Sequence, residues 1–353
     1  MKAYVQDFNN ILRGIKERVN LTSNPHEADI FILWQDVRGG MKTLCDINKN
    51  YIGKPVVVVQ HGRGATRDYN APNNFPLLAN KICVWGEAEF ERMERAGYGD
   101  KTIITGSPLA SLMRNVKKDD YCEKTIVYSP VIAAHEEAFN LEVYYELKKI
   151  EYEYSKRFLK KYEKRLKMGW HAYLIDETVA TEGSIPYDLI RKDFFVVAKL
   201  TDIHDQKLYH GVSVKTNVCN VAHLENTIKV LQNTSMLVGV EEGTMQLMAS
   251  YLDIPTLIVD GFEYGNYGGV EDYKTELIRS DATAFCTIDK LQETIEYELE
   301  NKEKRQEARR EVIRREFDPF PDKDPIETII DVASNVLGSD IRKEEYYGQR
   351  VNC

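Results

Sequence analysis

A histidine directly after an apolar run is the first candidate for chemistry. His61 stands at the end of the apolar run 55–60 and is followed by Gly62 and Arg63. In an open parallel sheet, residues just beyond the carboxyl end of a strand face the ligand crevice. An imidazole there can take a proton from an acceptor hydroxyl near neutral pH, and glycine lets the backbone approach a substrate. The competing interpretation is a loop histidine that bonds a neighbouring carbonyl, and the position after the strand favours the general base.

The same loop carries charges that can serve this histidine. Arg63 can hold phosphate oxygens, and Asp68 can orient the imidazole. Each can equally be a solvated loop charge.

A second candidate follows the apolar run 236–240. Glu241, Glu242, Gly243 and Thr244 precede a predicted helix over 245–252. The N–H groups and the positive dipole end of a helix start make a phosphate site, and Gly243 permits close backbone approach. Thr244 is predicted to cap the helix, while Glu241 or Glu242 can accept hydrogen bonds from ribose or sugar hydroxyls. The plainer interpretation is an ordinary threonine cap with two exposed acids.

Two further strand ends carry polar residues that we expect at the same crevice. Ser129 follows the run 125–128, and Lys199 follows the run 194–198. His204 and Asp205 lie a few residues further on, but no paired spacing typical of metal ligands accompanies them, and we interpret them as a solvated loop. No obligatory metal or cofactor is predicted.

The elements that must position these residues alternate between apolar runs and helical patterns. Runs that are apolar on both faces indicate parallel strands covered by helices on each side. Such runs span 29–34, 55–60, 81–85, 101–105, 125–128, 194–198, 236–240, 256–259 and 284–288. Helical spacing predicts helices over 87–96, 141–167, 224–232, 292–315 and 326–337. This alternation is typical of doubly wound sheets.

The chain divides after a charged stretch. We predict an N-terminal Rossmann-like, acceptor-side domain over 1–116 and a C-terminal Rossmann-like domain for a nucleotide donor over 117–322. The proline-rich loop 318–322 should turn the chain, so that residues 323–353 form a C-terminal helix and tail that crosses back to the first domain. Two such domains in tandem imply a cleft between them.

Composition and missing motifs limit the classes of partner, compartment and enzyme that fit this sequence. The net charge of −9 disfavours nucleic acid as the main partner, although a local basic groove stays open. Six cysteines without a C-x-x-C pair indicate a reducing compartment, and we expect a cytoplasmic protein. No window approaches the length of apolar sequence that a membrane span needs, so any membrane contact would be peripheral. The sequence also lacks the P-loop, the G-x-G-x-x-G fingerprint and the G-x-S-x-G elbow.

The order of short motifs resembles the GT-B glycosyltransferase superfamily. The motifs are Gln60-His-Gly, Trp85-Gly, Gly106-Ser-Pro, and Glu241-Glu-Gly-Thr before Ile254-Pro. Within the superfamily, the branches resembled are CDP-glycerol glycerophosphotransferase-like and UDP-N-acetylglucosamine 2-epimerase-like.

The resemblance implies two doubly wound Rossmann-like domains that face each other across a cleft. It makes His61 the base and Gly243 with Thr244 the cradle of a donor diphosphate, of UDP or CDP type. The chain departs from the pattern at Lys199-Leu-Thr-Asp, where the glycerophosphotransferases carry Lys-x-His-Pro, and at Met248-Ala, where many relatives carry Glu-Ala.

These observations lead to one hypothesis and two alternatives. The hypothesis is a metal-independent transferase that moves a sugar or polyol phosphate from a nucleotide-activated donor to an acceptor hydroxyl, with domain closure excluding water. One alternative is a UDP-sugar 2-epimerase on the same architecture. The other is a non-catalytic protein that binds a nucleotide sugar or a polymer.

Overall fold

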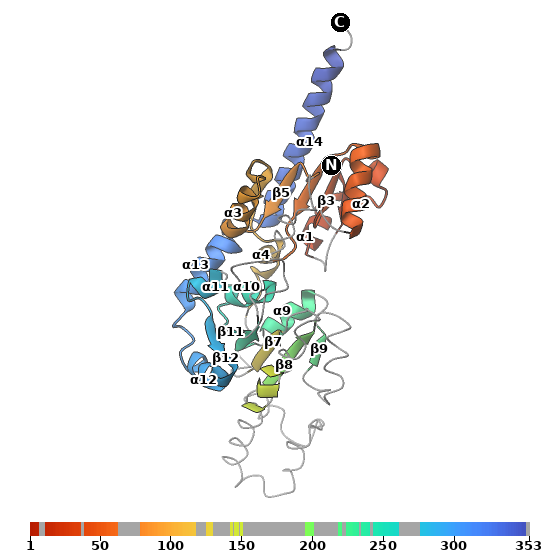
Figure 1. Cartoon of the computed structure of the whole chain (residues 1–353). Coiled ribbons are helices and arrows are strands. Elements are labelled where there is room, and N and C mark those ends of the chain that lie inside the picture. Colours follow the sequence, from red (N-terminus) through yellow and green to blue (C-terminus); the bar gives the residue numbers. More distant parts are fainter. Residues whose placement is uncertain are drawn as a thin grey trace, which may run out of the picture. The chain divides into compact units, whose positions relative to one another are not determined.

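The computed structural model describes most of the chain outside several connecting segments (Figure 1). The described residues are 1–6, 11–36, 39–62, 78–117, 125–129, 142–143, 145–147, 149–150, 195–200, 218–220, 224–232, 234–240, 243–260 and 276–350, with the backbone alone at 39–41, 125, 195–200, 218–220, 224–226 and 339–350.

The chain forms two compact units. Unit 1 comprises residues 1–114 and 313–353, and unit 2 comprises residues 115–312. The last part of the chain therefore belongs to the same unit as its beginning.

The described strands of unit 1 form one parallel, six-stranded sheet in the order β2-β1-β3-β4-β5-β6. The strands are β1 (Lys2–Gln6), β2 (Asn20–Leu21), β3 (Ile30–Leu33), β4 (Val56–Val59), β5 (Lys81–Val84) and β6 (Thr102–Ile104). The described helices are α1 (Arg13–Lys16), α2 (Gly39–Ile47), α3 (Glu87–Arg95), α4 (Pro108–Met113) and α14 (Pro325–Arg350), with the short turns η1 (Pro25–Glu27), η2 (Asn48–Ile52) and η4 (Gly99–Lys101). Chain order reverses direction in this sheet between β1 and β3.

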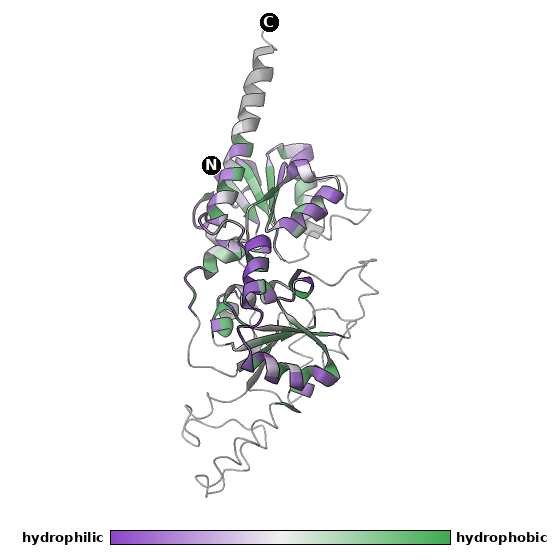
Figure 2. Ribbon diagram, turned by 90° about the vertical axis from the view of Figure 1, so that its left-hand side faces the viewer, coloured by the Kyte–Doolittle hydropathy of each residue, from purple (hydrophilic) through white to green (hydrophobic). Residues whose placement is uncertain are grey.

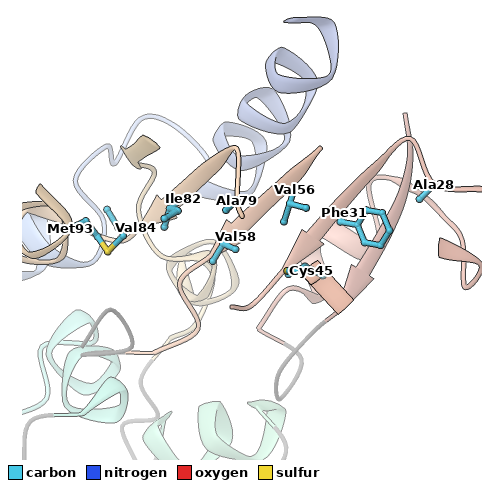
Figure 3. Close-up of a cluster of buried hydrophobic side chains, with 10 residues drawn as sticks. Ala28, Phe31, Cys45, Val56, Val58, Ala79, Ile82, Val84 and Met93 are labelled. Carbon is cyan, nitrogen blue, oxygen red and sulfur yellow. The ribbon is translucent and has the colours of Figure 1, made fainter. Parts of the chain in front are cut away.

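Both faces of the central strands β3, β4 and β5 are buried. Alternate side chains of β3, β4 and β5 form a core cluster with residues of α2 and α3 (Figure 3): Phe31, Leu33, Val56, Val58, Ile82, Val84, Cys45 and Met93. The other face of the same strands packs against α14, which is labelled in Figure 1 and leads to the C-terminus. Because successive side chains point to opposite faces, two covered faces require continuous apolar strands. The predicted strands over 29–34, 55–60 and 81–85 are confirmed.

The described strands of unit 2 also form one parallel, six-stranded sheet, in the order β12-β11-β10-β7-β8-β9. The strands are β7 (Thr125–Ser129), β8 (Phe195–Leu200), β9 (Val218–Asn220), β10 (Met236–Gly239), β11 (Thr256–Asp260) and β12 (Ala284–Thr287). The described helices include α9 (Leu224–Gln232), α10 (Thr244–Tyr251), α11 (Glu276–Arg279) and α12 (Leu291–Glu300), with η6 (Ile288–Lys290). Helix α13 (Gln306–Glu316) begins in this unit and ends in unit 1. In Figure 2 the strands are hydrophobic and the helices show hydrophilic residues.

Numbered from its own first strand, the unit 2 sheet runs 3-2-1-4-5-6. This is the strand order of dinucleotide-binding folds, and chain order reverses between β7 and β10. The fold class is therefore α/β with two doubly wound, parallel, Rossmann-like sheets.

One predicted helix is wrong. Instead of a single helix over 292–315, the chain forms α12 and α13 with a turn over 301–305. Asn301 ends α12, and its side-chain amide donates to the Tyr297 carbonyl at 2.8 Å. Arg305 then holds the turn by donating to Glu298 at 3.1 Å. The charged composition of the segment hid this break because both helices carry the same residue types.

The other predicted helices agree with the structure where it describes them, whereas α1, α2, α4 and α11 were not predicted. The helices over 87–96 and 224–232 are confirmed as α3 and α9. Helix α14 begins one residue before the predicted 326 and continues well past 337. Of the predicted helix over 141–167, most lies outside the described residues, and the described part, within 142–150, is helical.

Candidate functional site

His61 lies at the carboxyl edge of the unit 1 sheet, two residues after β4. Its Nδ1 is 3.2 Å from the carbonyl oxygen of Trp34, which follows the neighbouring strand β3. The rings of Trp34 and His61 meet edge to face, with centroids 4.7 Å apart. When the neutral ring donates Nδ1–H to this carbonyl, its lone pair lies on Nε2. The histidine thus bonds a neighbouring carbonyl, and this bond is compatible with a base that acts through Nε2.

Gln60 connects the end of β4 to the end of β5. Its side-chain Oε1 accepts from the Trp85 backbone N–H at 2.8 Å, and its Nε2 donates to the Gly62 carbonyl at 2.9 Å. Its backbone carbonyl accepts from the Trp85 indole Nε1–H at 2.9 Å, and its backbone N–H donates to Cys83 at 2.9 Å. Gln60 is buried. Sequence reasoning gave this residue no role, although a polar residue closing an all-valine run was the available signal.

Trp85 and Gly86 pack against residues 315–325, which we call the C-terminal segment. The ring of Phe317 meets that of Trp85 edge to face at 5.6 Å. A Cβ on Gly86 would lie 2.5 Å from the Arg315 carbonyl oxygen, so a side chain there would collide with backbone. The buried Glu316 carboxylate accepts from the Ala88 N–H at 3.1 Å, in the first turn of α3. Trp85 and Gly86 therefore allow the C-terminal segment to pack closely against the strand β5 and the helix α3.

The Gly106-Ser-Pro motif meets the same segment. Ser107 donates its backbone N–H to the Phe317 carbonyl at 2.8 Å, and its hydroxyl accepts from the Leu109 N–H at 3.3 Å to cap α4. Gly106 has φ +79°, a left-handed conformation that glycine adopts without strain, and faces the Pro325 ring. Two of the short motifs thus hold the end of the chain in place.

Thiol chemistry is disfavoured beside His61. Burial raises the pKa of the Cys83 thiol to about 12, and that of Cys45 to about 12 as well. Both thiols stay protonated near neutral pH and are weak nucleophiles.

In unit 2, Gly243 begins the helix that follows β10. Its N–H donates to the side-chain Oε1 of Gln246 at 3.0 Å, and its carbonyl accepts from the Gln246 N–H at 3.2 Å. The predicted cap at Thr244 is wrong, because Gly243 takes the extended N-cap conformation and Thr244 is already the first helical residue. The Gln246 side chain supplies the reciprocal bond that closes the helix start.

Ser129 and this helix start lie at the reversal of chain order in unit 2. Ser129 ends β7 and pairs in register with Gly239, the last residue of β10. Gly243 and Thr244 follow β10 in the chain and begin α10. The crevice outside such a reversal is where open α/β sheets bind ligands.

Lys199 lies within a strand rather than after one. The predicted strand ended at 198, whereas β8 continues to Leu200, and Lys199 pairs in register with Cys219 of β9. Tyr128 pairs with Ala198, so Lys199, one residue further along β8, is at the level of Ser129. Its backbone is still at the carboxyl end of β8.

Four predicted site residues, Arg63, Asp68, Glu241 and Glu242, lie outside the described residues, as do His204 and Asp205. Within the described ranges, no three His, Cys, Asp or Glu side chains gather as a metal site would need. Among the helices described, none has the length and apolar character to cross a membrane.

No protein-family model matches the sequence, and no curated protein matches it. Solved structures do match. A His-to-Asn variant of the wall teichoic acid polymerase TagF aligns with a TM-score of 0.56 at 9% identity, covering 98% of this chain and 90% of that chain. The same variant soaked with CDPG gives 0.56 at 8% identity, covering 97% and 89%. UDP-GlcNAc 2-epimerase from Methanocaldococcus jannaschii gives 0.50 at 10% identity, covering 88% and 98%.

These likenesses define the class of fold. The chain has a GT-B glycosyltransferase-like fold, and the predicted resemblance is confirmed at that level. At such low identity the likeness extends to the fold alone.

Proposed function

We propose that this protein is a transferase that moves a sugar or a polyol phosphate from a nucleoside-diphosphate donor to an acceptor hydroxyl. One observation carries the proposal: Ser129 pairs in register with Gly239 at the strand-order reversal of unit 2, and the Gly243–Thr244 helix start follows that strand. A donor diphosphate bound there would meet the positive end of the α10 dipole and the N–H groups of its first turn.

His61 is the proposed general base. The Trp34 carbonyl holds Nδ1, so Nε2 takes the proton from the acceptor hydroxyl. In sugar transfer, the acceptor oxygen bonds to the anomeric carbon as the bond from that carbon to the diphosphate oxygen breaks. In polyol-phosphate transfer, the acceptor oxygen bonds to phosphorus and a nucleoside monophosphate leaves.

The remaining predicted residues complete the proposal. Arg63 and Lys199 hold donor phosphates, Asp68 orients the imidazole, and Glu241 or Glu242 binds hydroxyls of the donor. The reaction needs no metal, because cationic side chains and the helix dipole balance the leaving phosphate. We place the enzyme in the cytoplasm, where such donors and free thiols are compatible.

The proposal is tested by donor binding and turnover. Purified protein is heated with UDP, CDP, GDP or TDP, and a nucleotide that binds the native state raises Tm. The selected nucleotide's sugar or polyol donor is then incubated with hydroxyl acceptors, and released nucleotide is measured. We expect stabilisation by UDP or CDP and acceptor-dependent release. Stabilisation without release across the acceptor panel would instead support a non-catalytic binding protein.

A second candidate is a UDP-sugar 2-epimerase. The likeness to an epimerase that covers 98% of that chain favours it. This activity needs no acceptor, so incubation with UDP-N-acetylglucosamine alone separates the two candidates. Formation of the epimer would replace the transferase proposal.

A further inference from the structure

Gln60 uses every hydrogen-bonding group it has in a buried frame around His61. Its amide bridges the Trp85 N–H and the Gly62 carbonyl, so the residues on both sides of His61 are held by one side chain. Its backbone carbonyl is held by the Trp85 indole. The backbone at His61 is therefore fixed from both sides.

Trp85 is fixed in turn by the C-terminal segment. Phe317 is fully buried, meets the Trp85 ring edge to face, and accepts from Ser107 through its carbonyl. Contacts thus run from Phe317 through Trp85 to Gln60 and the His61 loop, and all of them lie within unit 1.

Ending the strand β4 does not by itself require so many hydrogen bonds from one buried residue. Burying an amide is costly unless its donors and acceptors are paired, whereas the preceding residues of β4 are all valine. A fully paired buried network favours one geometry, because each departure leaves a polar group unsatisfied. One geometry is what a proton-transferring imidazole needs, since small displacements of a reacting group are expensive in rate.

We propose that Gln60 and Trp85 are positioning residues for His61, and that Phe317 holds Trp85 in place for that purpose. The inference rests on the proposed function, in which His61 is the base. Gln60 sets the backbone on either side of the histidine, and the Trp34 carbonyl then selects the Nδ1–H tautomer.

The test uses two variants of the frame in the full chain. Trp85→Phe keeps an aromatic ring against Phe317 but removes the indole donor to Gln60. Gln60→Ala removes the whole amide bridge. The matched control is Asn48→Ala, which removes another buried amide of unit 1. Asn48 bonds the Lys54 N–H at 3.0 Å and the Lys54 carbonyl at 2.6 Å, before β4 begins and so at the opposite end of that strand from Gln60.

The first readout is steady-state kinetics. Both frame variants should lower kcat by about 10- to 100-fold while donor KM stays within about twofold. Asn48→Ala should lower Tm and leave kcat unchanged at a temperature where it is folded. Frame variants whose kcat matches that of Asn48→Ala would overturn the proposal.

The second readout does not depend on turnover. In protein labelled with ¹³C,¹⁵N-histidine, the His61 ring signals are assigned by their loss in His61→Ala. We expect an Nδ1–H tautomer in the wild type and in Asn48→Ala, and a mixture of tautomers in both frame variants. Unchanged His61 signals in the variants would refute positioning. Altered signals together with an active His61→Ala would instead refute the role of His61 as base. If Gln60→Ala does not fold, Trp85→Phe still decides the question.

Discussion

The two units contain the same kind of sheet and differ in how their candidate sites arise. Both sheets are parallel and six-stranded over the described residues, but unit 1 has the order 2-1-3-4-5-6 and unit 2 has 3-2-1-4-5-6. In unit 2, the candidate residues Ser129 and Gly243 lie at the strand-order reversal. In unit 1 the reversal is between β1 and β3, and His61 follows β4, one strand further on.

The two candidate sites are positioned by different features of the structure. A reversal opens a crevice through backbone topology alone, so the unit 2 site depends on few side chains. His61 does not lie at a reversal of strand order. It is held instead by Trp34, by Gln60 and, through Trp85, by the C-terminal segment. We therefore expect the unit 1 site to respond to distant substitutions and the unit 2 site to respond mainly at its glycine.

The largest expected effect is that of His61→Ala. Loss of a general base should lower kcat by about 10²- to 10⁴-fold, with Tm within a few degrees of the wild type. The matched control is His26→Ala, which changes an exposed histidine of the same unit. A steady-state assay with saturating donor measures both. A near-normal kcat in His61→Ala would show that His61 is not the general base, and the comparison of the two candidate sites would no longer hold.

Gly86→Ala should show that unit 1 depends on the C-terminal segment. The new Cβ meets the backbone of Arg315 and Glu316, so overpacking should cost about 1–3 kcal/mol of unfolding free energy. Denaturant titration measures this.

The control for Gly86→Ala is Gly338→Ala. A Cβ at Gly338, in α14, meets nothing within 4 Å, so alanine should be neutral or stabilise by about 0.5–1 kcal/mol. Equal stability of the two variants would contradict the close approach at Gly86.

Gly243→Ala should act on donor binding and leave the fold intact. The backbone is extended there, and a Cβ would lie 3.4 Å from the Gln246 Oε1, so alanine fits with a small adjustment. A methyl group at the helix start should still keep a diphosphate away from the backbone. We expect donor Kd to rise about tenfold, which is about 1.4 kcal/mol, with Tm unchanged. Calorimetric titration with the nucleotide found by thermal shift measures it, and an unchanged Kd would place the donor elsewhere.

The smallest expected effect is a pH dependence in unit 1. Burial acts to raise the pKa of Asp324, but hydrogen bonds from Ser111 and Arg18 outweigh it and hold the pKa below its ordinary value of 3.8. A lowered folded pKa stabilises the native state above pH 3.8, and this stabilisation is lost as the pH falls through the folded value. Asp324→Asn should therefore flatten the acid limb of the stability curve by about 1 kcal/mol or less.

The control for the acid limb is Asp322→Asn, an exposed position on the same loop. Chemical denaturation at several pH values compares the variants with the wild type. If Asp324→Asn and Asp322→Asn have the same acid limb, the contacts of Asp324 do not contribute to stability.

Local pattern was sufficient to predict nine of the described strands and the helices α3, α9, α10 and α14, but it missed the strands β1, β2 and β9 and the helices α1, α2, α4 and α11. The runs 55–60 and 236–240 are apolar because both faces of their strands are covered, and that requirement is visible residue by residue. The position of His61 after a strand was visible for the same reason. The fold class follows from this alternation, and the likeness to solved GT-B structures agrees with it.

Contacts between residues that are far apart in the chain depend on tertiary structure alone. The pairing of Glu316 with the start of α3, the contact of Phe317 with Trp85 and the bridge made by Gln60 join residues whose sequence neighbours carry no sign of each other. The same holds for strand order, since equally apolar strands can be arranged as 2-1-3 or 3-2-1. Sequence periodicity reports which face of an element is buried, whereas the identity of what covers it depends on the packing of the whole unit.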